Sequence, residues 1–243
     1  MYLQTYDWAP YHFGIFVGVN FMDYTLNLKP NYQNVIHTNY EDIKDLAGTT
    51  ENGFQSYQII SVTRDTIDRF FRKMPLPGFS VGVIGDLRLG NYFNLRMIPT
   101  FSLSEINVDY TIQINANDTT QIVAVSHNDH VNCLELPLHI KYRSKRYNNV
   151  GAYLVGGLNP KLYFTSKKHK NNVDWINTKP FDLALEMGVG FDFYNPWFKM
   201  GVEVKMGFGL LNTLKKEEEQ VYFYGHPLEK LKNKQLQVSL TFE

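Results

Sequence analysis

The side chains best suited to acid–base or metal chemistry lie together in one short segment, Ser-His-Asn-Asp-His. It contains His127, Asp129 and His130, and imidazole and carboxylate groups can bind a metal ion or exchange protons near neutral pH. A metal site needs three or four ligands, and no further ligand follows at a fixed spacing. We therefore interpret the segment as a solvated loop. A loop site for metal binding or acid–base work is the alternative.

Other signatures of catalysis are missing from the sequence. No serine lies in the context of a nucleophile elbow, and Gly82, Gly85 and Gly90 lack the strand-to-helix setting of a phosphate loop. Cys133 is the single cysteine, which excludes an intrachain disulfide framework. The chain has 24 basic and 24 acidic residues, a balance that predicts no nucleic-acid partner. We expect no catalytic residue, no cofactor and no bound metal.

A balanced set of charged residues instead recurs at every second position of predicted strands. Six acids and six bases share this placement with one histidine. A buried charge is costly unless it is paired, so we predict that these residues form a structural network of ion pairs. Its members are Asp86, Arg88, Arg96, Glu135, His139, Lys141, Arg143, Asp182, Glu186, Asp192, Lys199, Glu203 and Lys205. We interpret His139 as a histidine satisfied within this network rather than as a base.

The elements that would position these charges are clearest between Phe181 and Leu211. Phe181 to Phe193 and Phe198 to Leu210 place large apolar side chains at every second position, with charged residues or glycine between them. This period of two predicts two strands joined by a tight turn. A tilted strand of roughly 9 to 11 residues crosses a bilayer. One apolar and one polar face are the repeat of a membrane-spanning β-barrel.

The same alternation predicts eight strands along the chain. They are Tyr11–Leu28, Phe79–Leu89, Phe93–Ile114, Leu134–Tyr142, Ala152–Leu162, Phe181–Phe193, Phe198–Leu210 and Leu236–Phe242. In the first, the apolar residues change from odd to even positions near Met22 and Asp23, which a β-bulge would explain. Apolar residues change parity in the third strand too, and we expect Gln121–Ser126 to pair with its projecting end. Pro99 and Pro137 each remove a ladder donor and are expected to mark local bulges.

The connections between these strands alternate in length. Those after the second, fourth and sixth strands are short and the others are long, as in outer-membrane barrels with short periplasmic turns and long outer loops. We predict an all-β fold, an eight-stranded antiparallel transmembrane β-barrel with both termini in the periplasm. Residues 1–11 would be a periplasmic N-terminal segment and residues 12–243 a single barrel domain. Residues 29–77 would be a long first extracellular loop, with an extended piece at Tyr57–Val62 and a short helix at Thr66–Met74.

The predicted size of the barrel bears on its interior. Eight strands enclose a space just wide enough for side chains to fill it, so paired charges would close the lumen and we expect no conducting channel. No segment approaches the roughly 18 consecutive apolar residues of a transmembrane helix. The start of the chain lacks the basic and apolar regions of a signal peptide. We therefore expect a mature chain whose export signal has been removed.

Several segments carry a resemblance to a known family. Leu134–Tyr142, which reads Leu-Glu-Leu-Pro-Leu-His-Ile-Lys-Tyr, looks like the E-x-P-L-x-x-K-Y motif of the broad outer-membrane β-barrel family of Bacteroidota. Three blocks, Pro77–Thr100, Lys141–Asn159 and Lys179–Leu210, resemble the PorT family, called SprT in gliding species. Members of that family are components of the type IX secretion system.

The resemblance implies a function without catalysis. It implies an integral outer-membrane protein needed to export proteins with a C-terminal signal, and for gliding in some species. We expect it to contact outer-membrane lipids, and other secretion subunits through its loops or barrel wall. Two alternatives remain: a small barrel with loop-based lipid-modifying activity, and an adhesin or ligand-binding barrel.

Overall fold

The computed structural model describes residues 3, 6–40, 54–64, 76–117, 119–164, 178–215 and 227–243. These residues form one 12-stranded sheet in which every pairing is antiparallel. Its strands are β1 (Tyr11–Leu28), β2 (Ile36–His37), β3 (Phe54–Arg64), β4 (Pro77–Arg88), β5 (Phe93–Met97), β6 (Thr100–Ala116), β7 (Thr119–Glu135), β8 (Leu138–Arg143), β9 (Val150–Tyr163), β10 (Phe181–Tyr194), β11 (Lys199–Gly209) and β12 (Leu228–Phe242). Two 3-10 turns, η1 (Tyr6–Trp8) and η2 (Tyr32–Asn34), flank β1. The predicted helix at Thr66–Met74 lies outside the described residues.

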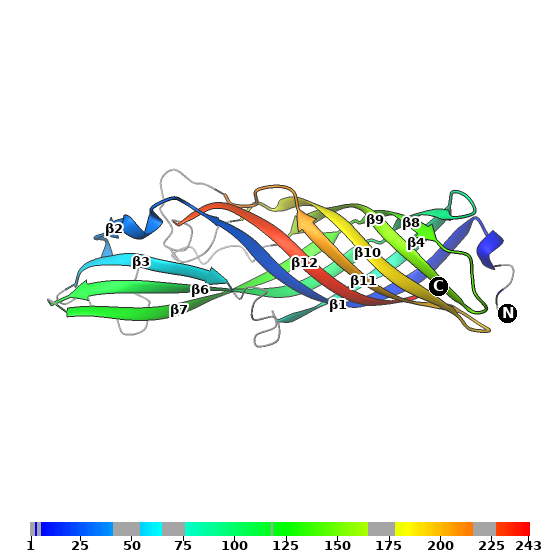
Figure 1. The fold of residues 1–243 in the computed structure, drawn as a ribbon, viewed down its shortest axis with the longest axis horizontal. Helices are drawn as coiled ribbons and strands as arrows, with labels where there is room; N and C mark the ends of the chain where they lie inside the picture. Colours follow the sequence, from blue (N-terminus) through cyan, green and yellow to red (C-terminus); the bar gives the residue numbers. More distant parts are fainter. Residues whose placement is uncertain are drawn as a thin grey trace.

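Most of the sheet closes into a ring of eight strand positions (Figure 1). β10, β11, β12, β1 and β4 follow one another around it. β4 then pairs with both β5 and β6, those strands pair with β8 and β7, and both of these pair with β9. β9 pairs with β10 and completes the circuit. The ring therefore has no free edge, as the predicted eight-stranded arrangement requires.

Two of the eight positions are each divided by a proline. Pro99 separates β5 from β6, and Pro137 separates β7 from β8. Each keeps its carbonyl in the ring: Pro99 O accepts from Val83 N at 3.1 Å, and Pro137 O accepts from Ile98 N at 3.2 Å. Each proline lacks an N–H, so one backbone hydrogen bond of the ladder is missing there. Its carbonyl still accepts a hydrogen bond, so the ring stays closed.

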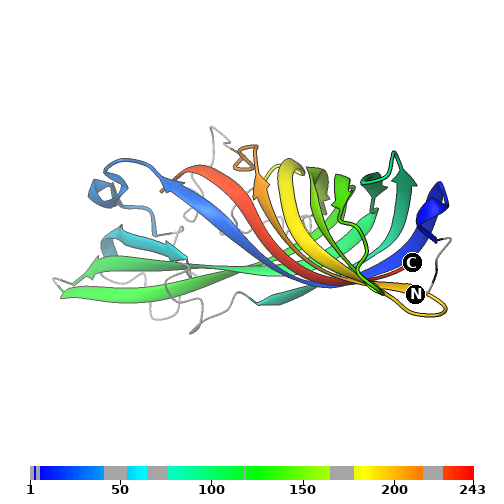
Figure 2. The same cartoon turned by 45° about the vertical axis from the view of Figure 1, so that its right-hand side comes forward.

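A second part of the sheet projects beyond the ring, away from the end where both chain termini lie (Figures 1 and 2). We call β2, β3, residues 106–116 of β6 and residues 119–131 of β7 the extension. β6 and β7 pair without a break from Thr100↔Glu135 to Ala116↔Thr119, and β3 pairs with the outer edge of β6. The predicted return of Gln121–Ser126 is confirmed. The predicted long loop after the third strand is wrong, because a hairpin takes its place.

The predicted first loop, residues 29–77, also contributes to this extension. β3 spans Phe54–Arg64, so the extended piece expected at Tyr57–Val62 is confirmed. β2 pairs with it through Ile36↔Gln58 and His37↔Tyr57. This part of the segment is therefore sheet rather than an irregular loop.

The predicted β-bulge at Met22 and Asp23 is wrong. β1 and β12 keep one register from Ile15 to Asn27, and even-numbered side chains of β1 remain the more buried ones on both sides of Met22. The chemistry of the two faces changes while the backbone does not. Inside the ring the inward side chains are mostly polar, and beyond it the inward side chains of β1 are apolar, as Met22 and Tyr24 are.

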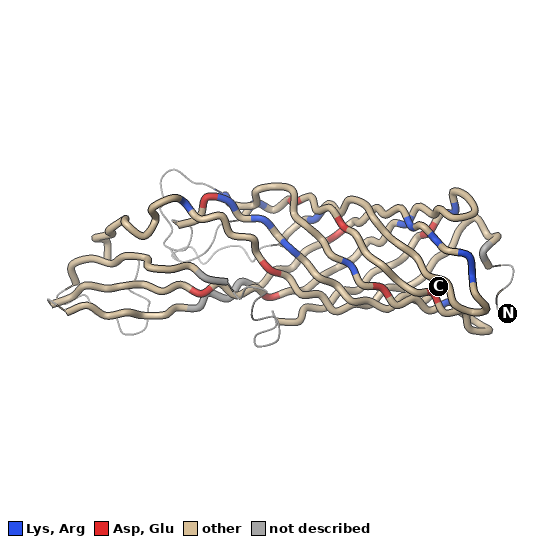
Figure 3. Tube along the Cα trace, viewed as in Figure 1, with Lys and Arg blue, Asp and Glu red and all other residues tan. Residues whose placement is uncertain are grey.

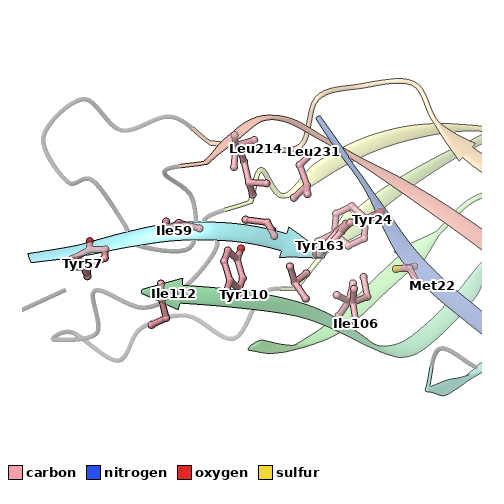
Figure 4. Packing of buried hydrophobic residues seen from close by; sticks show 14 of the residues in the cluster. Met22, Tyr24, Tyr57, Ile59, Ile106, Tyr110, Ile112, Tyr163, Leu214 and Leu231 are labelled. Atoms are coloured by element: carbon pink, nitrogen blue, oxygen red, sulfur yellow. The ribbon is translucent and has the colours of Figure 1, made fainter. Parts of the chain in front are cut away.

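Two kinds of interior result. In the extension and the adjoining end of the ring, an apolar cluster fills the interior, with Met22, Tyr24, Tyr57, Ile59, Ile106, Tyr110, Ile112, Tyr163, Leu214 and Leu231 among its members (Figure 4). The rest of the ring interior is mostly polar and charged, apart from a small buried cluster of Phe16, Ile84 and Ile98. The outer wall of the ring exposes large apolar side chains. Central examples are Ile15, Val83, Ile140, Leu154 and Val189, each 52–58% exposed. No helix among the described residues has the length and apolar character needed to cross a membrane.

Candidate functional site

The interior of the ring holds a network of buried ion pairs centred on Arg96 of β5. The Arg96 guanidinium lies 2.9 Å from Glu203 Oε2, 2.7 Å from Glu243 Oε1 and 3.4 Å from Asp86 Oδ2, and its side chain has no exposed surface. Three neighbouring carboxylates from β4, β11 and the residue after β12 therefore compensate one fully buried cation. A guanidinium suits this role because its five N–H donors point in fixed directions.

A second cluster shares Glu243 with the first. Lys199 Nζ forms an ion pair with Glu243 and lies 3.9 Å from Asp192 Oδ2. Lys141 Nζ lies 2.7 Å from the same Asp192 oxygen. Lys141 also lies 3.7 Å from the centre of the Tyr153 ring, an arrangement in which the negative face of the ring stabilises the ammonium.

The third cluster lies around Glu186 of β10. Its carboxylate lies 2.9 Å from His139 Nε2, 3.8 Å from Lys205 Nζ and 4.0 Å from Lys161 Nζ. Lys161 Nζ is 3.3 Å from Glu135, whose carboxylate also accepts a hydrogen bond from Asn159 at 2.6 Å. Acidic and basic positions are interleaved along the strands of the ring (Figure 3), and in these clusters each cation contacts at least one carboxylate.

Small residues of the inner wall make room for the large ones. A Cβ atom at Gly190 would collide with the Tyr153 ring, and a Cβ at Gly201 would collide with Thr241. The alternation of glycine with charge in β10 and β11 thus allows bulky and charged side chains to fill the interior. The ring interior is a packed polar core in its central part.

The N-terminal segment covers one end of this core. Tyr6 of η1 donates from its hydroxyl to Glu243 Oε2 at 3.0 Å, and its ring stacks on His12 with centroids 4.0 Å apart. His12 Nε2 donates in turn to the Tyr6 carbonyl at 2.8 Å. Burial raises the pKa of the Tyr6 hydroxyl well above its usual value, so Tyr6 stays protonated and can donate to the carboxylate.

The inverted distribution of polarity, apolar outside and charged inside, is what a lipid-facing barrel requires. The profile of a family described as "Outer membrane protein beta-barrel domain" matches residues 5–215. The chain belongs to this family. A comparison with curated proteins found no match. The matched region reaches from η1 to just beyond β11. β12, which closes the barrel in the structure, lies outside it.

Membership indicates an outer-membrane location, which bears on what the apolar outer wall faces. The exposed Phe, Leu, Val and Ile side chains of the ring face lipid in a protein of this family, rather than a second sheet. Lipid rather than water thus surrounds the outer wall, which explains why apolar side chains are exposed there.

The predicted network residues do not all lie in one place in this barrel. Ten of the thirteen lie in the three clusters: Asp86, Arg96, Glu135, His139, Lys141, Glu186, Asp192, Lys199, Glu203 and Lys205. Asp182 instead accepts hydrogen bonds from the Leu183 N–H and the Asn233 amide. Arg88 and Arg143 lie at the mouth of the barrel, where they line a cavity.

Two members of the network were missed by the sequence prediction. Lys161 continues the series of inward residues that occupy every second position of β9. This alternation in the sequence indicates that Lys161 is buried. Glu243 continues the row Gln235, Gln237, Ser239, Thr241, so the same parity placed it inward. The predicted strand ends at Phe242, one position before this residue.

The segment Ser-His-Asn-Asp-His lies in β7 rather than in a loop, so that prediction is wrong. His127, Asp129 and His130 pair with Val108, Ile106 and Glu105 of β6. His130 is exposed. Among the described residues, no three His, Cys, Asp or Glu side chains are close enough to hold a metal ion.

Proposed function

We propose that this barrel is a non-enzymatic component of the type IX protein secretion system. It would support export of proteins that carry a C-terminal signal, and gliding motility in gliding species. The resemblance of Pro77–Thr100, Lys141–Asn159 and Lys179–Leu210 to the PorT family supports this assignment. Those blocks supply all or part of six strands of the barrel wall and most of the charged interior.

The observation that carries the proposal is the filled interior. Arg96, Glu203 and Lys199 have side chains at most 3% exposed, and their ion pairs bridge β5, β11 and the residue after β12. A folded cargo protein cannot pass through such a core. The barrel would therefore act as an accessory or assembly subunit and contact partners through its extension, loops or outer wall.

We place both termini in the periplasm and the extension outside the cell. The short connections β4–β5, β8–β9 and β10–β11 lie at the end that holds the termini (Figure 1), and short periplasmic turns are the rule for bacterial outer-membrane barrels. Cysteine labelling of intact cells tests this orientation. A cysteine at Thr119, in a Cys133→Ser background, should react with a membrane-impermeant maleimide, and one at Asn149 should not.

Gene deletion tests the secretion role. Loss of the protein should leave cargo with a C-terminal signal inside the cell, and normal surface delivery of that cargo would refute the proposal. Purified protein in a planar bilayer should show no stable large single-channel current. A large stable current would refute the filled lumen on which the accessory role depends.

A loop-based lipid-modifying enzyme is the second candidate. Variants expressed in the deletion strain can test it. His139 has no exposed side-chain surface and contacts Glu186, whereas His130 is exposed on β7. These two histidines therefore do not form a common site. Replacing His127, His130 and His139 with alanine should leave the outer-membrane lipid profile unchanged; a changed profile with intact secretion would favour the enzyme.

A further inference from the structure

A cavity opens at the mouth of the barrel, at the end covered by η1. Its volume is about 340 Å³, and it lies between Trp8, the β4–β5 turn, the β8–β9 turn and the end of β10. This volume is within the range of small-ligand pockets, about 300–1,000 Å³. The cavity is separate from the three ion-pair clusters, apart from Asp192, which the cavity and the second cluster share.

Cations outnumber anions among the residues that line this cavity. Arg88, Arg143, Lys145 and Arg146 are basic, and Asp192 has the one carboxylate among the described lining residues. Arg143 and Arg146 also interact with neighbouring groups of the protein, which leaves Arg88 and Lys145 as the cations best placed to contact a ligand. Asp192 is only 2% exposed and lies 2.7 Å from Lys141 Nζ, so its charge is already used in the second cluster. A concave surface on which positive charge predominates concentrates anionic ligands.

Two of the guanidinium groups are held in place by aromatic rings. The Arg88 guanidinium lies 5.2 Å from the centre of the Trp8 ring, and that of Arg146 lies 3.2 Å from the Tyr194 ring. Arg88 also donates to Gly90 O at 3.0 Å and Asn91 Oδ1 at 3.1 Å. Groups fixed before binding lose little entropy when a ligand arrives, and a fixed guanidinium suits the planar geometry of a carboxylate.

The rim of the cavity also offers uncharged surface. Trp8 is 73% and Tyr92 39% exposed, so flat aromatic faces lie beside the cations. A chain that alternates carboxylates with peptide groups matches this mixture of fixed charge and aromatic surface. A small free anion would use only the charge.

We propose that the mouth cavity binds an acidic peptide segment. A side-chain carboxylate would contact Arg88 and Lys145, and the peptide backbone beside it would pack on Trp8. In the orientation proposed above, such a segment would come from a periplasmic protein. The binding itself does not depend on the secretion role, so failure of the export test would leave this inference standing.

Calorimetric titration of the purified protein in detergent micelles tests the inference. An acetylated tri-glutamate peptide should bind, and binding should weaken as salt screens the exposed charges. Tri-glutamine of the same length should not bind, and succinate should bind at least tenfold more weakly than tri-glutamate. Equal binding of tri-glutamine, or succinate binding as tightly as the peptide, would overturn the inference.

Variants then locate the site. Arg88→Gln combined with Lys145→Gln should weaken tri-glutamate binding at least tenfold, because each removes a charge-assisted contact. Lys145→Gln alone changes an exposed side chain, so it should fold normally and still weaken binding severalfold. The matched control is Lys230→Gln with Lys232→Gln on β12 at the opposite end, which removes the same charge. Unchanged binding in the Arg88 and Lys145 variants, or equal loss in the control, would contradict the proposed site.

Discussion

The ring and the extension differ in which face of the sheet is polar: the ring is mostly polar inside and apolar outside, and the extension is the reverse. Strand β6 runs through both regions and shows both arrangements. The buried positions of β6 are Thr100, Ser102 and Ser104 inside the ring, then Ile106, Val108, Tyr110, Ile112 and Ile114 in the extension. The outward positions change from Phe101 and Leu103 to Glu105, Asn107 and Asp109. The backbone alternation continues without a shift, so the surroundings alone decide which face is polar.

The change occurs at the same level in neighbouring strands. Phe21 and Leu236 are cross-strand partners on the outer face, and the next outward pair is Asp23 with Lys234. Beyond Lys234, β12 also turns Lys232 and Lys230 outward. The outer surface therefore passes from apolar to charged within one step of two residues. Such a boundary is where an apolar bilayer gives way to an aqueous phase.

The largest expected effect comes from breaking the charged core. Arg96→Met leaves carboxylates buried without their main cation, and removing one partner of a buried ion pair costs about 3–5 kcal/mol. Urea unfolding of the protein in lipid vesicles would measure this loss of stability. The double variant Arg96→Met/Glu203→Met should be more stable than Arg96→Met alone. If it is less stable, these two residues do not act as a pair.

The apolar core of the extension should break separately. Ile112 is fully buried, and Ile112→Ala should destabilise the extension by about 2–5 kcal/mol because it leaves a cavity. Hydrogen exchange should then accelerate for residues 106–116 while β10 and β11 stay protected. Thr111→Ala, on the outward face, is the control. Equal acceleration in β10 and β11 would show that both regions unfold as one unit.

A charge placed on the outer face should cost more on the ring than on the extension. Val189 is 52% exposed in the middle of β10, and Val189→Lys should cost about 2–4 kcal/mol where lipid surrounds it. Gln113→Lys, on the outward face of β6 in the extension, should change stability by about 0.5 kcal/mol or less. Folding yields in lipid vesicles compare the two variants. Similar yields would contradict the assignment of lipid and water to the two regions.

The smallest effect concerns the cover over the mouth. Tyr6→Phe removes the hydroxyl that donates to Glu243 and should cost about 1 kcal/mol. Hydrogen exchange at residues 6–9 should become faster while the strands remain protected. Tyr11→Phe, at a 63% exposed position, is the matched control. Unchanged exchange in Tyr6→Phe would mean that this hydrogen bond does not hold the segment.

The sequence predicted the parts of the fold that depend on local alternation. The eight strand positions and the inward charges follow from a period of two, because a strand with different solvents on its two faces must alternate. Arg96, Lys141 and Glu203 were assigned inward on this ground. What alternation cannot supply is the partner of each strand, which depends on residues distant in the chain.

The failures have the same origin. The change of parity near Met22 predicts a bulge only if the environment stays constant along the strand, and here the environment changes instead. The polar composition around His127 predicts a loop, because pairing with β6 leaves no sign in the segment's own composition. The mouth cavity was not predicted either: Arg88 and Arg143 were expected in the central network, and only the folded turns bring them together with Trp8.

Glu243 links the closure of the ring to its charged interior. β12 pairs with β11 on one side and with β1 on the other. Pairing with β11 sets the Glu243 carboxylate beside Lys199, and closure of the ring brings Arg96 of β5 to the same carboxylate. One side chain thus joins strands from both sides of the β1–β12 junction through a shared negative charge.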